Sequence, residues 1–476
     1  MSGDAEDRIR ADRIAKVDAM RAAGVDPYPA RTPARVPVGE IRERFGELPA
    51  EAETGTRLAV AGRIAARRGH GKAMFLDLTD RTGRLQLHAT VDALGEERYA
   101  ALSDTDLGDL VAAGGDIFVS RRGELSLRVR EWHMLAKCLR PLPEKWHGLS
   151  DVELRHRRKY VDLLVNEDSR RLALARPRMV TAMRAALDGD GFVEVETPIL
   201  QPIYGGASAE PFTTYFNEFD REFYLRIADE LYLKRLIVGG LERVYEIGKD
   251  FRNEGVSFKH NPEFTMLEWY EAYGDYEDGM RRVETVVAAA GAAAGSAIDL
   301  TPPWPRLALR DAIAEHAGID PMADRDRDRD RLVGFLDAQG IDTSADRTWA
   351  DAVDHLLSHF VEPALDRPTF LIDYPVELSP LAKRSPADDS VVERFEAFCA
   401  GMEIANGYTE LNDPADQRAR FEAGGRVDED YVLALEFGMP PTVGVGIGVD
   451  RLAMALLGVR SIREVILFPT LRERDG

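Results

Sequence analysis

Short runs in which apolar residues alternate with polar ones recur in two separate parts of the chain, and they limit its fold more than any other feature. Residues 57–140 contain RLAVAGRI, MFLDLTD, RTGRLQLHAT and DIFVSRRGELSLRVREWHML, separated by Gly or Asp turns. Several strands with one buried face in so short a segment predict a small β-barrel. Beyond residue 166, EFYLRI, RVYEIGKDFR, FTMLEWYEAY and VGVGIGVDRLAM predict an antiparallel sheet flanked by helices. The fold class is therefore α/β of the α+β kind.

The length of 476 residues is too great for one core and predicts about three units. We expect a helical arm over residues 1–56, with a charged helix at about 8–23 that ends at Gly24, and the barrel over 57–140. A linker over 141–165 leads to the α/β unit at 166–476, which carries a helical insertion at about 276–366. We interpret the Asp/Arg alternation at Asp324 to Asp330 as a solvent-exposed, salt-bridged segment.

Charge is unevenly distributed along the chain. The net charge is −21, but residues 57–140 hold 14 Lys and Arg against 11 Asp and Glu, which gives +3 there and −24 elsewhere. The cationic run from Arg155 to Lys159 is typical of a solvated helix face, although its place beside a basic barrel favours nucleic-acid binding.

The chain has no apolar run of about 18 residues to cross a bilayer and no secretory signal. Its two cysteines, Cys138 and Cys399, exclude a disulfide scaffold and a cysteine metal cluster. We therefore expect a cytoplasmic protein with no membrane partner.

The segment from Asp250 to Tyr273 combines charged residues with two strand-like runs around a polar turn. A solvent-facing sheet accounts for this alternation about as well as a site does. Two residues favour a site. Arg252 ends an apolar strand, where its planar fork suits a carboxylate or phosphate, and Phe264 follows on the return strand, where a purine ring would stack.

Two further segments carry weaker signals. In GVGIGVDRLAM, three glycines permit close backbone approach and Arg451 opens a helix whose N-terminus favours anions, but glycine-rich turns of this kind are common. ERFEAFCAGMEIANGYTELND contains Glu396 and Glu403, which offer the carboxylate oxygens that Mg²⁺ prefers. The alternative is that both lie on one charged edge of a helix.

Together these segments resemble the class II aminoacyl-tRNA synthetases, and within them the bacterial-type lysyl-tRNA synthetases, from about residue 8 to residue 472. GFVEVETPIL resembles the family's dimer-forming motif 1, FRNEG through HNPEFTMLEWY its motif 2, and GVGIGVDRL its motif 3. GGASA, RIADELYLKRLIVGG, LSPLAKRS, ANGYTELND, LRPLPEKWHGL and SIREVILFPTLR also match that family, in the same order.

The resemblance implies an N-terminal OB-fold barrel that reads the tRNA anticodon and a class II catalytic sheet that works as a homodimer. It also implies a reaction. The lysine carboxylate attacks the α-phosphate of ATP, giving lysyl-adenylate and pyrophosphate, and the lysyl group then passes to the 3′ end of tRNA(Lys). Such displacements depend on positioning and charge neutralisation, so no enzyme nucleophile is required.

The family pattern also implies roles for individual residues. Arg252 and Arg451 are the expected catalytic arginines. Arg252 would bind both the α-phosphate and the lysine carboxylate, and Arg451 would bind the γ-phosphate. The expected ATP site comprises Arg252, Glu254, His260, Asn261, Phe264, Glu396, Glu403, Gly448 and Arg451, with Mg²⁺ on Glu396 and Glu403. The expected lysine site comprises Gly206, Ala228, Glu230, Arg252, Glu268, Tyr270, Asn406, Tyr408 and Glu410. The expected anticodon contacts are Arg67, Arg68, Phe75, Gln86 and Glu124.

The chain departs from the family at four positions. Glu210 and Met402 stand where arginine is usual, and Tyr215 with Phe216 where a His-His pair is usual. Three functions therefore compete: charging of tRNA with lysine, activation of lysine or an analogue by a paralogue for a non-translational acceptor, and non-catalytic tRNA binding. The complete barrel favours the first over the second, and Arg252, Glu403 and Arg451 argue against the third.

Overall fold

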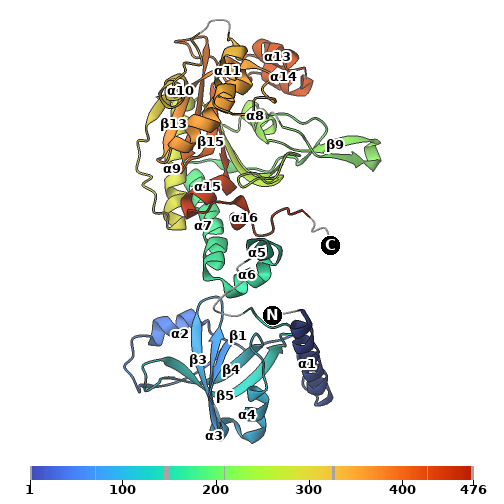
Figure 1. Ribbon diagram of the computed structural model, residues 1–476, viewed down its shortest axis with the longest axis vertical. Coiled ribbons are helices and arrows are strands. Elements are labelled where there is room, and N and C mark those ends of the chain that lie inside the picture. The colour runs from blue at the N-terminus through green and yellow to red at the C-terminus, as the bar shows by residue number, and fades with distance from the viewer. Residues whose placement is uncertain are drawn as a thin grey trace. The chain divides into compact units, whose positions relative to one another are not determined.

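The computed structural model describes residues 3–69, 71–143, 151–207, 209–323, 327–425 and 427–472. The chain divides into two compact units, residues 1–148 and 149–476, whose elements are labelled in Figure 1 and which we describe separately. Among the described residues, none of the helices has the length and apolar character that a membrane crossing requires.

The first unit is a closed five-stranded barrel with strand order β1-β2-β3-β5-β4, as the sequence predicts. Its core is formed by the alternate, inward-facing residues of each strand, among them Leu76, Leu87 and Leu127, and α2 covers it with Val38 and Ile41. The elements are α1 (Gly3–Ala22), α2 (Val38–Phe45), β1 (Glu53–Arg68), β2 (Ala73–Thr79), β3 (Arg84–Thr90), α3 (Val91–Leu94), α4 (Glu96–Ser103), β4 (Leu110–Val119) and β5 (Leu125–Ala136).

The expected N-terminal helix is present as α1, and buried polar contacts fasten it to the barrel unit. Arg13 donates to the carbonyl oxygens of Cys138 and Arg140 at 2.7 and 3.0 Å. Lys16 pairs with Asp106 at 3.3 Å. The helix is thus part of this unit. Residues 144–150 of the expected linker lie outside the described ranges.

The second unit is built on an eight-stranded sheet with the order β12-β13-β14-β15-β16-β11-β10-β6. Its interior pairs are all antiparallel, as predicted, and parallel pairs occur only at the two edges. The sheet strands are β6 (Val193–Glu194), β10 (Arg243–Phe251), β11 (Glu263–Ala272), β12 (Arg306–Ala308), β13 (Thr369–Pro375), β14 (Val391–Cys399), β15 (Met402–Thr409) and β16 (Thr442–Gly448).

A small second sheet, in the order β7-β9-β8, stands out from this unit (Figure 1). Its strands are β7 (Leu200–Gln201), β8 (Thr213–Phe216) and β9 (Arg221–Leu225). The helices of the unit are α5 (Val152–Arg157), α6 (Lys159–Val165), α7 (Glu167–Gly189), α8 (Glu230–Val238), α9 (Tyr276–Ala294), α10 (Leu309–Ala317), α11 (Arg329–Ala338), α12 (Trp349–Leu356), α13 (Pro414–Ala423), α14 (Glu429–Glu436), α15 (Val449–Leu457) and α16 (Ile462–Val465), with short 3₁₀ or π turns at 217–219, 357–364 and 376–378.

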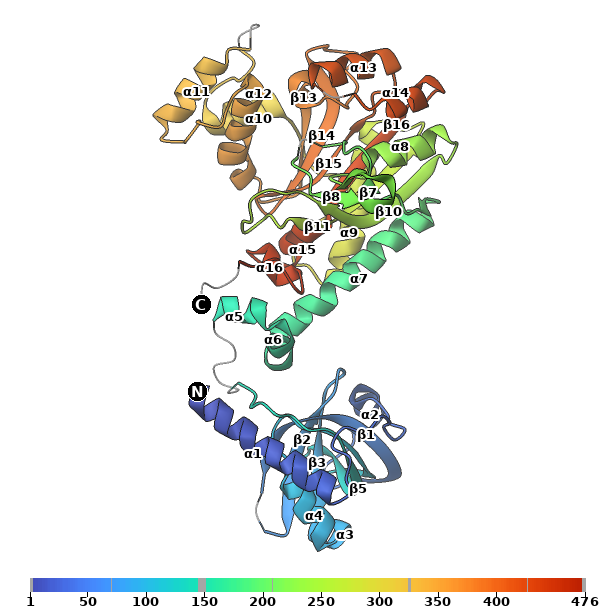
Figure 2. The same cartoon turned by 90° about the vertical axis from the view of Figure 1, so that its right-hand side faces the viewer.

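One face of the large sheet is apolar and is covered by α7, α9 and α15 (Figure 2). Leu267, Trp269 and Ile447 point from the strands into this core and are fully buried. Met179 and Met183, which lie four residues apart on one face of α7, meet them. Because strand side chains alternate, the polar residues between these apolar ones all point to the opposite face.

Two segments differ from their sequence patterns. GFVEVETPIL forms only β6 and the start of β7, because Pro198 has no N–H to donate and the residues beside it pair with different sheets. The helical section at 276–366 also divides: α9 belongs to the main core, whereas α10, α11 and α12 pack in a second cluster around Leu309, Leu332 and Val353.

The Asp/Arg run is described from Arg327 onward, and Asp324, Arg325 and Asp326 lie outside the described residues. Arg327 pairs with Glu377 at 3.3 Å and Arg329 with Asp330 at 2.7 Å. The second of these pairs is solvent-exposed, as we expected for the run; the Arg327 side chain is largely covered.

Candidate active site

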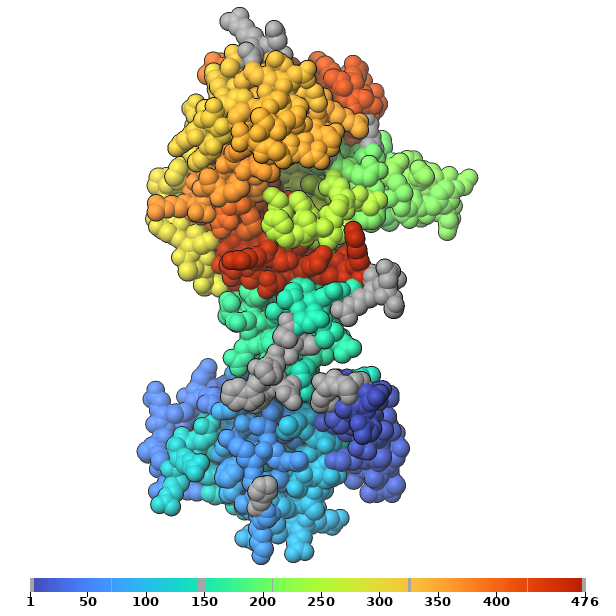
Figure 3. Space-filling view, viewed as in Figure 1, coloured from blue at the N-terminus to red at the C-terminus, as the bar shows by residue number. Residues whose placement is uncertain are grey.

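A cavity of about 690 Å³ opens over the polar face of the large sheet. Figure 3 shows a hollow between the yellow-green turn around residues 250–262 and the orange segments above it. The lining includes most of the residues predicted for ATP and lysine: Gly206, Ala228, Glu230, Arg252, Glu254, His260, Asn261, Phe264, Glu268, Tyr270, Glu403, Asn406, Tyr408, Gly448 and Arg451. Glu396 and Glu410 are buried and do not belong to that lining.

Strand register explains why residues so distant in sequence meet here. Glu268 of β11 is opposite Gly446 of β16, which is opposite Asn406 of β15, which is opposite Glu396 of β14. Two residues away, Tyr270, Gly444 and Tyr408 form the next row. A Cβ at Gly444 would lie 2.0 Å from Glu410 and 2.4 Å from Tyr270, so the floor between these side chains has room only for glycine.

Arg252 lies where β10 ends, beside the ring of Phe264, whose centroid is 5.1 Å from the guanidinium carbon. Its Nε is buried, and among the described residues no acceptor hydrogen-bonds to it. A guanidinium that lines a cavity and keeps a buried, unused donor is suited to an anionic ligand.

Arg451, at the start of α15, forms a second cationic position. Its Nη1 donates to Glu403 at 2.7 Å, and its Nη2 lies 3.0 Å from Nε2 of His260. Burial, with Arg451 nearby, lowers the pKa of His260, so the imidazole is neutral at pH 7 and accepts from the guanidinium. Asn261 holds the turn by donating to the carbonyl of Glu263 at 2.6 Å.

A pocket of carboxylates and tyrosines forms one side of the cavity. Glu230, at the start of α8, accepts a hydrogen bond from the Tyr408 hydroxyl at 2.8 Å and from Lys234 at 2.5 Å. Lys234 also pairs with Glu410, whose exposed fraction is 1%. Burial raises the pKa of Glu410 to about 8, and the Lys234 ammonium opposes that rise.

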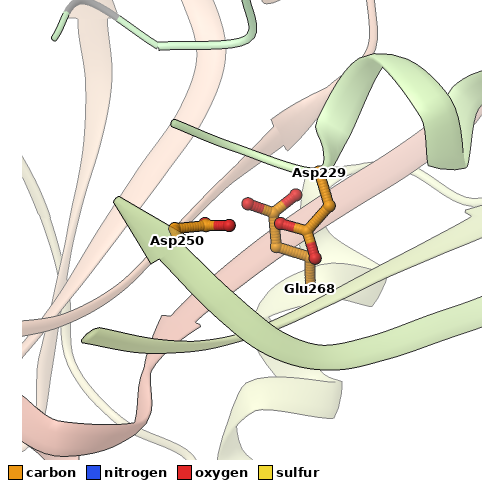
Figure 4. A group of neighbouring side chains, drawn as sticks. All are labelled: Asp229, Asp250 and Glu268. Atoms are coloured by element: carbon orange, nitrogen blue, oxygen red, sulfur yellow. The ribbon is translucent and has the colours of Figure 1, made fainter. Parts of the chain in front are cut away.

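Next to this pocket, Asp229, Asp250 and Glu268 point their carboxylates toward one another from α8's N-cap, β10 and β11 (Figure 4). Ligand atoms of all three lie within 4.8 Å of each other. Burial, together with the nearby Asp229 carboxylate, raises the pKa of both Glu268 and Asp250.

The positive charge of this cluster comes from Arg226, which is 0% exposed. Its guanidinium pairs with Glu246 at 2.6 Å, with Asp250 at 3.0 Å and with Asp229 at 3.8 Å. Three carboxylates thus share one fully buried guanidinium, and Glu268 adds a fourth carboxyl beside them, so the cluster still favours a further cation from the cavity.

The predicted Mg²⁺ ligands Glu396 and Glu403 lie on adjacent strands, β14 and β15, not on a helix edge. Glu396 accepts from Arg394 at 2.6 Å and from the Tyr374 hydroxyl at 2.7 Å. Burial raises the pKa of Glu396 to about 7, with Arg394 opposing and the Glu403 carboxylate adding to the rise. Two carboxylates that repel each other across a cavity wall fit a divalent cation, which would relieve that repulsion.

The four departures from the family pattern lie outside the described cavity lining. Glu210 is exposed, and its carbonyl accepts from the Asn253 N–H at 2.8 Å. Tyr215 and Phe216, on the projecting hairpin, are 54% and 42% exposed. Met402 packs against the main core.

Four of the five predicted anticodon residues lie on or beside one surface of the barrel. Phe75 pairs in register with Arg68 and His88 and stacks on the His88 ring at 4.6 Å between centroids. Gln86 lies one row away and accepts from Ser126 at 3.1 Å, and Glu124 precedes β5 at its edge. Arg67 differs: it donates to the carbonyl oxygens of Thr105, at 2.8 Å, and Ser103.

Sequence reasoning missed several residues of these sites. On the cavity wall they are Arg394 and Asp450, buried behind it Arg226, Asp229, Lys234 and Asp250, and on the barrel His88, Phe118 and Arg128. For Lys234 a signal was present, because it follows Glu230 by four residues and a helix places such residues on one face. For the barrel, the alternation that selects Phe75 and Gln86 also selects His88.

Two families match the chain. The class II tRNA synthetases (D, K and N) match residues 151–472, and the OB-fold nucleic acid binding domain matches residues 58–135. The two matches lie within the two compact units, one in each.

Similar curated proteins cover the chain almost end to end. A lysine--tRNA ligase of Chloroflexus aurantiacus is 49% identical over 489 residues, covering 98% of this chain and 99% of that protein. One of Moorella thermoacetica is 47% identical and covers all of both chains, and one of Roseiflexus castenholzii is 48% identical over 98% of this chain and 99% of its own. The chain therefore belongs to the class II tRNA synthetases of the D, K and N group, with an OB-fold domain at its N-terminal end.

Proposed function

We propose that the protein is a lysine--tRNA ligase, which activates L-lysine with ATP and transfers it to the 3′ end of tRNA(Lys). The observation that carries this proposal is that Glu230 and Glu268 line one cavity with Arg252, while the buried Glu410 lies behind Glu230 and shares Lys234 with it. A substrate with two ammonium groups and one carboxylate needs this arrangement of charges. The full-length similarity to lysine--tRNA ligases supports the same substrate.

Lysine would lie with its carboxylate at Arg252, its α-ammonium at Glu268 and the Gly206 carbonyl, and its side chain toward Glu230. Gly206 has φ +89°, and a Cβ there would lie 3.1 Å from Ala228 and 3.3 Å from Glu230. A side chain at this position would narrow the pocket mouth, so the glycine keeps the backbone close to the substrate. Tyr270, Asn406 and Tyr408 complete the walls.

ATP would lie between Arg252 and Arg451, with adenine on Phe264 and with Glu254, His260 and Asn261 also holding the nucleotide. Arg252 would neutralise the α-phosphate and the attacking carboxylate, which otherwise repel each other. Arg451, freed from Glu403, would hold the γ-phosphate of the leaving pyrophosphate. Glu396 and Glu403 would hold Mg²⁺, which supplies charge neutralisation on the phosphates when it is bound.

The barrel would read the anticodon, with Phe75 stacked on a base and Arg68, Gln86 and Glu124 at its neighbours. We also propose a cytoplasmic homodimer formed through motif 1. Val193, Ile199 and Leu200 support it, because these apolar side chains of motif 1 are 43–53% exposed at the surface.

Pyrophosphate exchange with each of the amino acids, and with lysine analogues, tests the proposal. Lysine should give the highest rate, and Glu230→Gln should raise the KM for lysine at least tenfold while the KM for ATP changes less than twofold. Glu242→Gln, a change at an exposed carboxylate, is the matched control and should behave as the parent. Exchange with an analogue but not with lysine would contradict the proposal.

A further inference from the structure

The side-chain end of the lysine pocket already contains an ammonium group of the protein itself. Lys234 is fully buried, with an exposed fraction of 0%. Its Nζ lies 2.5 Å from Oε1 of Glu230 and forms a second ion pair with Oε2 of Glu410. It also lies 5.6 Å from the ring centroid of Tyr408 and 5.9 Å from that of Tyr431.

We propose that Lys234 is a positioning residue for substrate selection. Its ammonium is a permanent counter-ion of Glu230 and Glu410, and it leaves one negative charge of the pair for the ammonium group of the substrate. This inference rests on the proposed function and goes beyond it. When the ammonium of a bound substrate favours ionisation of both carboxyls, Glu230 and Glu410 carry two negative charges, and the Lys234 ammonium balances one of them. The remaining charge matches the single ε-ammonium of lysine.

The geometry separates the resident ammonium from the place of the substrate. Glu230 belongs to the cavity lining, whereas Lys234 and Glu410 do not. Oε1 of Glu230 is occupied by Lys234 and by the Tyr408 hydroxyl, at 2.5 and 2.8 Å. Oε2 is the oxygen nearest the Gly206 position, at 3.6 Å from where a Cβ would lie there, and this side is open to a ligand. Lys234 therefore binds Oε1 of Glu230 on the side away from the cavity and leaves Oε2 for the substrate.

A buried pair of carboxylates needs such a cation to stay ionised. Burial by itself would lower the pKa of Lys234, but Glu230 and Glu410 outweigh it and raise that pKa well above its usual value. The other ionisable groups that face this ammonium are the hydroxyls of Tyr408 and Tyr431, and Glu268 and Tyr270 lie beyond Glu230. Without Lys234, one carboxyl would bind a proton in place of the fixed charge.

Lys234→Met tests the proposal, because methionine keeps the length of the side chain and removes its charge. In lysine-dependent pyrophosphate exchange, we expect the KM for lysine to rise about tenfold or more at pH 7, with the KM for ATP within about twofold of the parent. The pH at which the lysine KM reaches its minimum should move up by about one unit or more, because loss of a cation raises the pKa of the carboxyls beside it.

Lys159→Met is the matched control for removal of a buried, paired ammonium. Lys159 is 3% exposed, pairs with Asp162 at 3.1 Å and lies outside the cavity lining. Its loss should lower stability without moving the pH profile of the lysine KM. If Lys234 has only a structural role, Lys234→Met will also lower stability and leave the pH profile of the lysine KM unchanged. That outcome would overturn the proposal.

The double variant Lys234→Met/Glu410→Gln keeps the test decisive if the single variant folds poorly. It removes one charge of each sign, so the pocket again lacks one ammonium group, and we expect it to fold better and to have a lower KM for lysine than Lys234→Met. A double variant no better than the single one would also overturn the proposal. Failure of the proposed function is distinct, because the parent enzyme itself would then show no lysine-dependent exchange.

Discussion

The carboxylate of Asp450 accepts a hydrogen bond from the backbone N–H of Thr265 at 2.8 Å. It also accepts from the guanidinium of Arg176 at 2.6 Å. These contacts join α7, β11 and α15, which come from three distant parts of the sequence. Because Arg451 follows Asp450 directly, they also fix where that guanidinium enters the cavity.

Replacement of this carboxylate should therefore cost both stability and activity. Asp450→Asn keeps the shape but leaves the Arg176 charge without its partner, and we expect it to lower the free energy of unfolding by about 2 kcal/mol. Urea unfolding measures the loss. Glu194→Gln removes an exposed partner of Arg184 and should cost less than about 1 kcal/mol. Equal costs for the two variants would mean that Asp450 does not anchor the motif.

The ring of Phe264 should contribute to ATP affinity alone. Phe264→Leu removes the aromatic face beside Arg252, and we expect the KM for ATP to rise about twofold to tenfold, in line with about 0.5–1.5 kcal/mol for an aromatic contact. The KM for lysine should change little. Phe258→Leu alters a 60% exposed ring in the same turn and should leave both constants unchanged. A rise in the KM for lysine of the same size would place Phe264 elsewhere in the site.

The Mg²⁺ requirement should depend on pH through Glu396. Its pKa of about 7 is raised from the ordinary value, so the carboxyl is protonated below pH 7 and ionised above it. Mg²⁺ must then compete with the proton at low pH, and the concentration for half-maximal exchange should rise by up to about tenfold per pH unit below pH 7. Glu396→Gln should show a high Mg²⁺ requirement at every pH. A requirement that does not vary between pH 6 and 8 in the parent would exclude this role.

The barrel should affect tRNA charging without affecting activation. Phe75→Ala removes the ring that stacks on His88, and we expect the KM for tRNA to rise by about tenfold or more, because a stacked base contributes about 1–3 kcal/mol. Lysine-dependent pyrophosphate exchange, which needs no tRNA, serves as the internal control and should be unchanged. Loss of both activities together would indicate that the substitution disturbs folding.

The sequence predicted the barrel, the antiparallel sheet and a set of ATP and lysine residues most of which line the cavity, because strand alternation and the three motifs are local patterns. It did not predict that Glu410 is buried with Lys234, since that contact joins the middle of α8 to the residue that follows β15. Nor did it predict the extent of motif 1, because Pro198 interrupts an otherwise strand-like run. Arg67 and Arg68 are neighbours in sequence, yet one binds the backbone at Thr105 and the other binds Asp77, a difference set by tertiary contacts.

One face of the large sheet packs in the apolar core and the other lines the cavity, so adjacent residues of each strand point to different faces. We therefore expect substitutions at the cavity-facing positions of β11 and β15 to change ligand binding with little effect on the core, whereas Gly444 of β16 leaves no room for a side chain. The matched family spans enzymes for D, K and N, three side chains that differ in charge. In a sheet built this way, the cavity-facing residues can change with the substrate while the core-facing residues that hold the fold together stay the same.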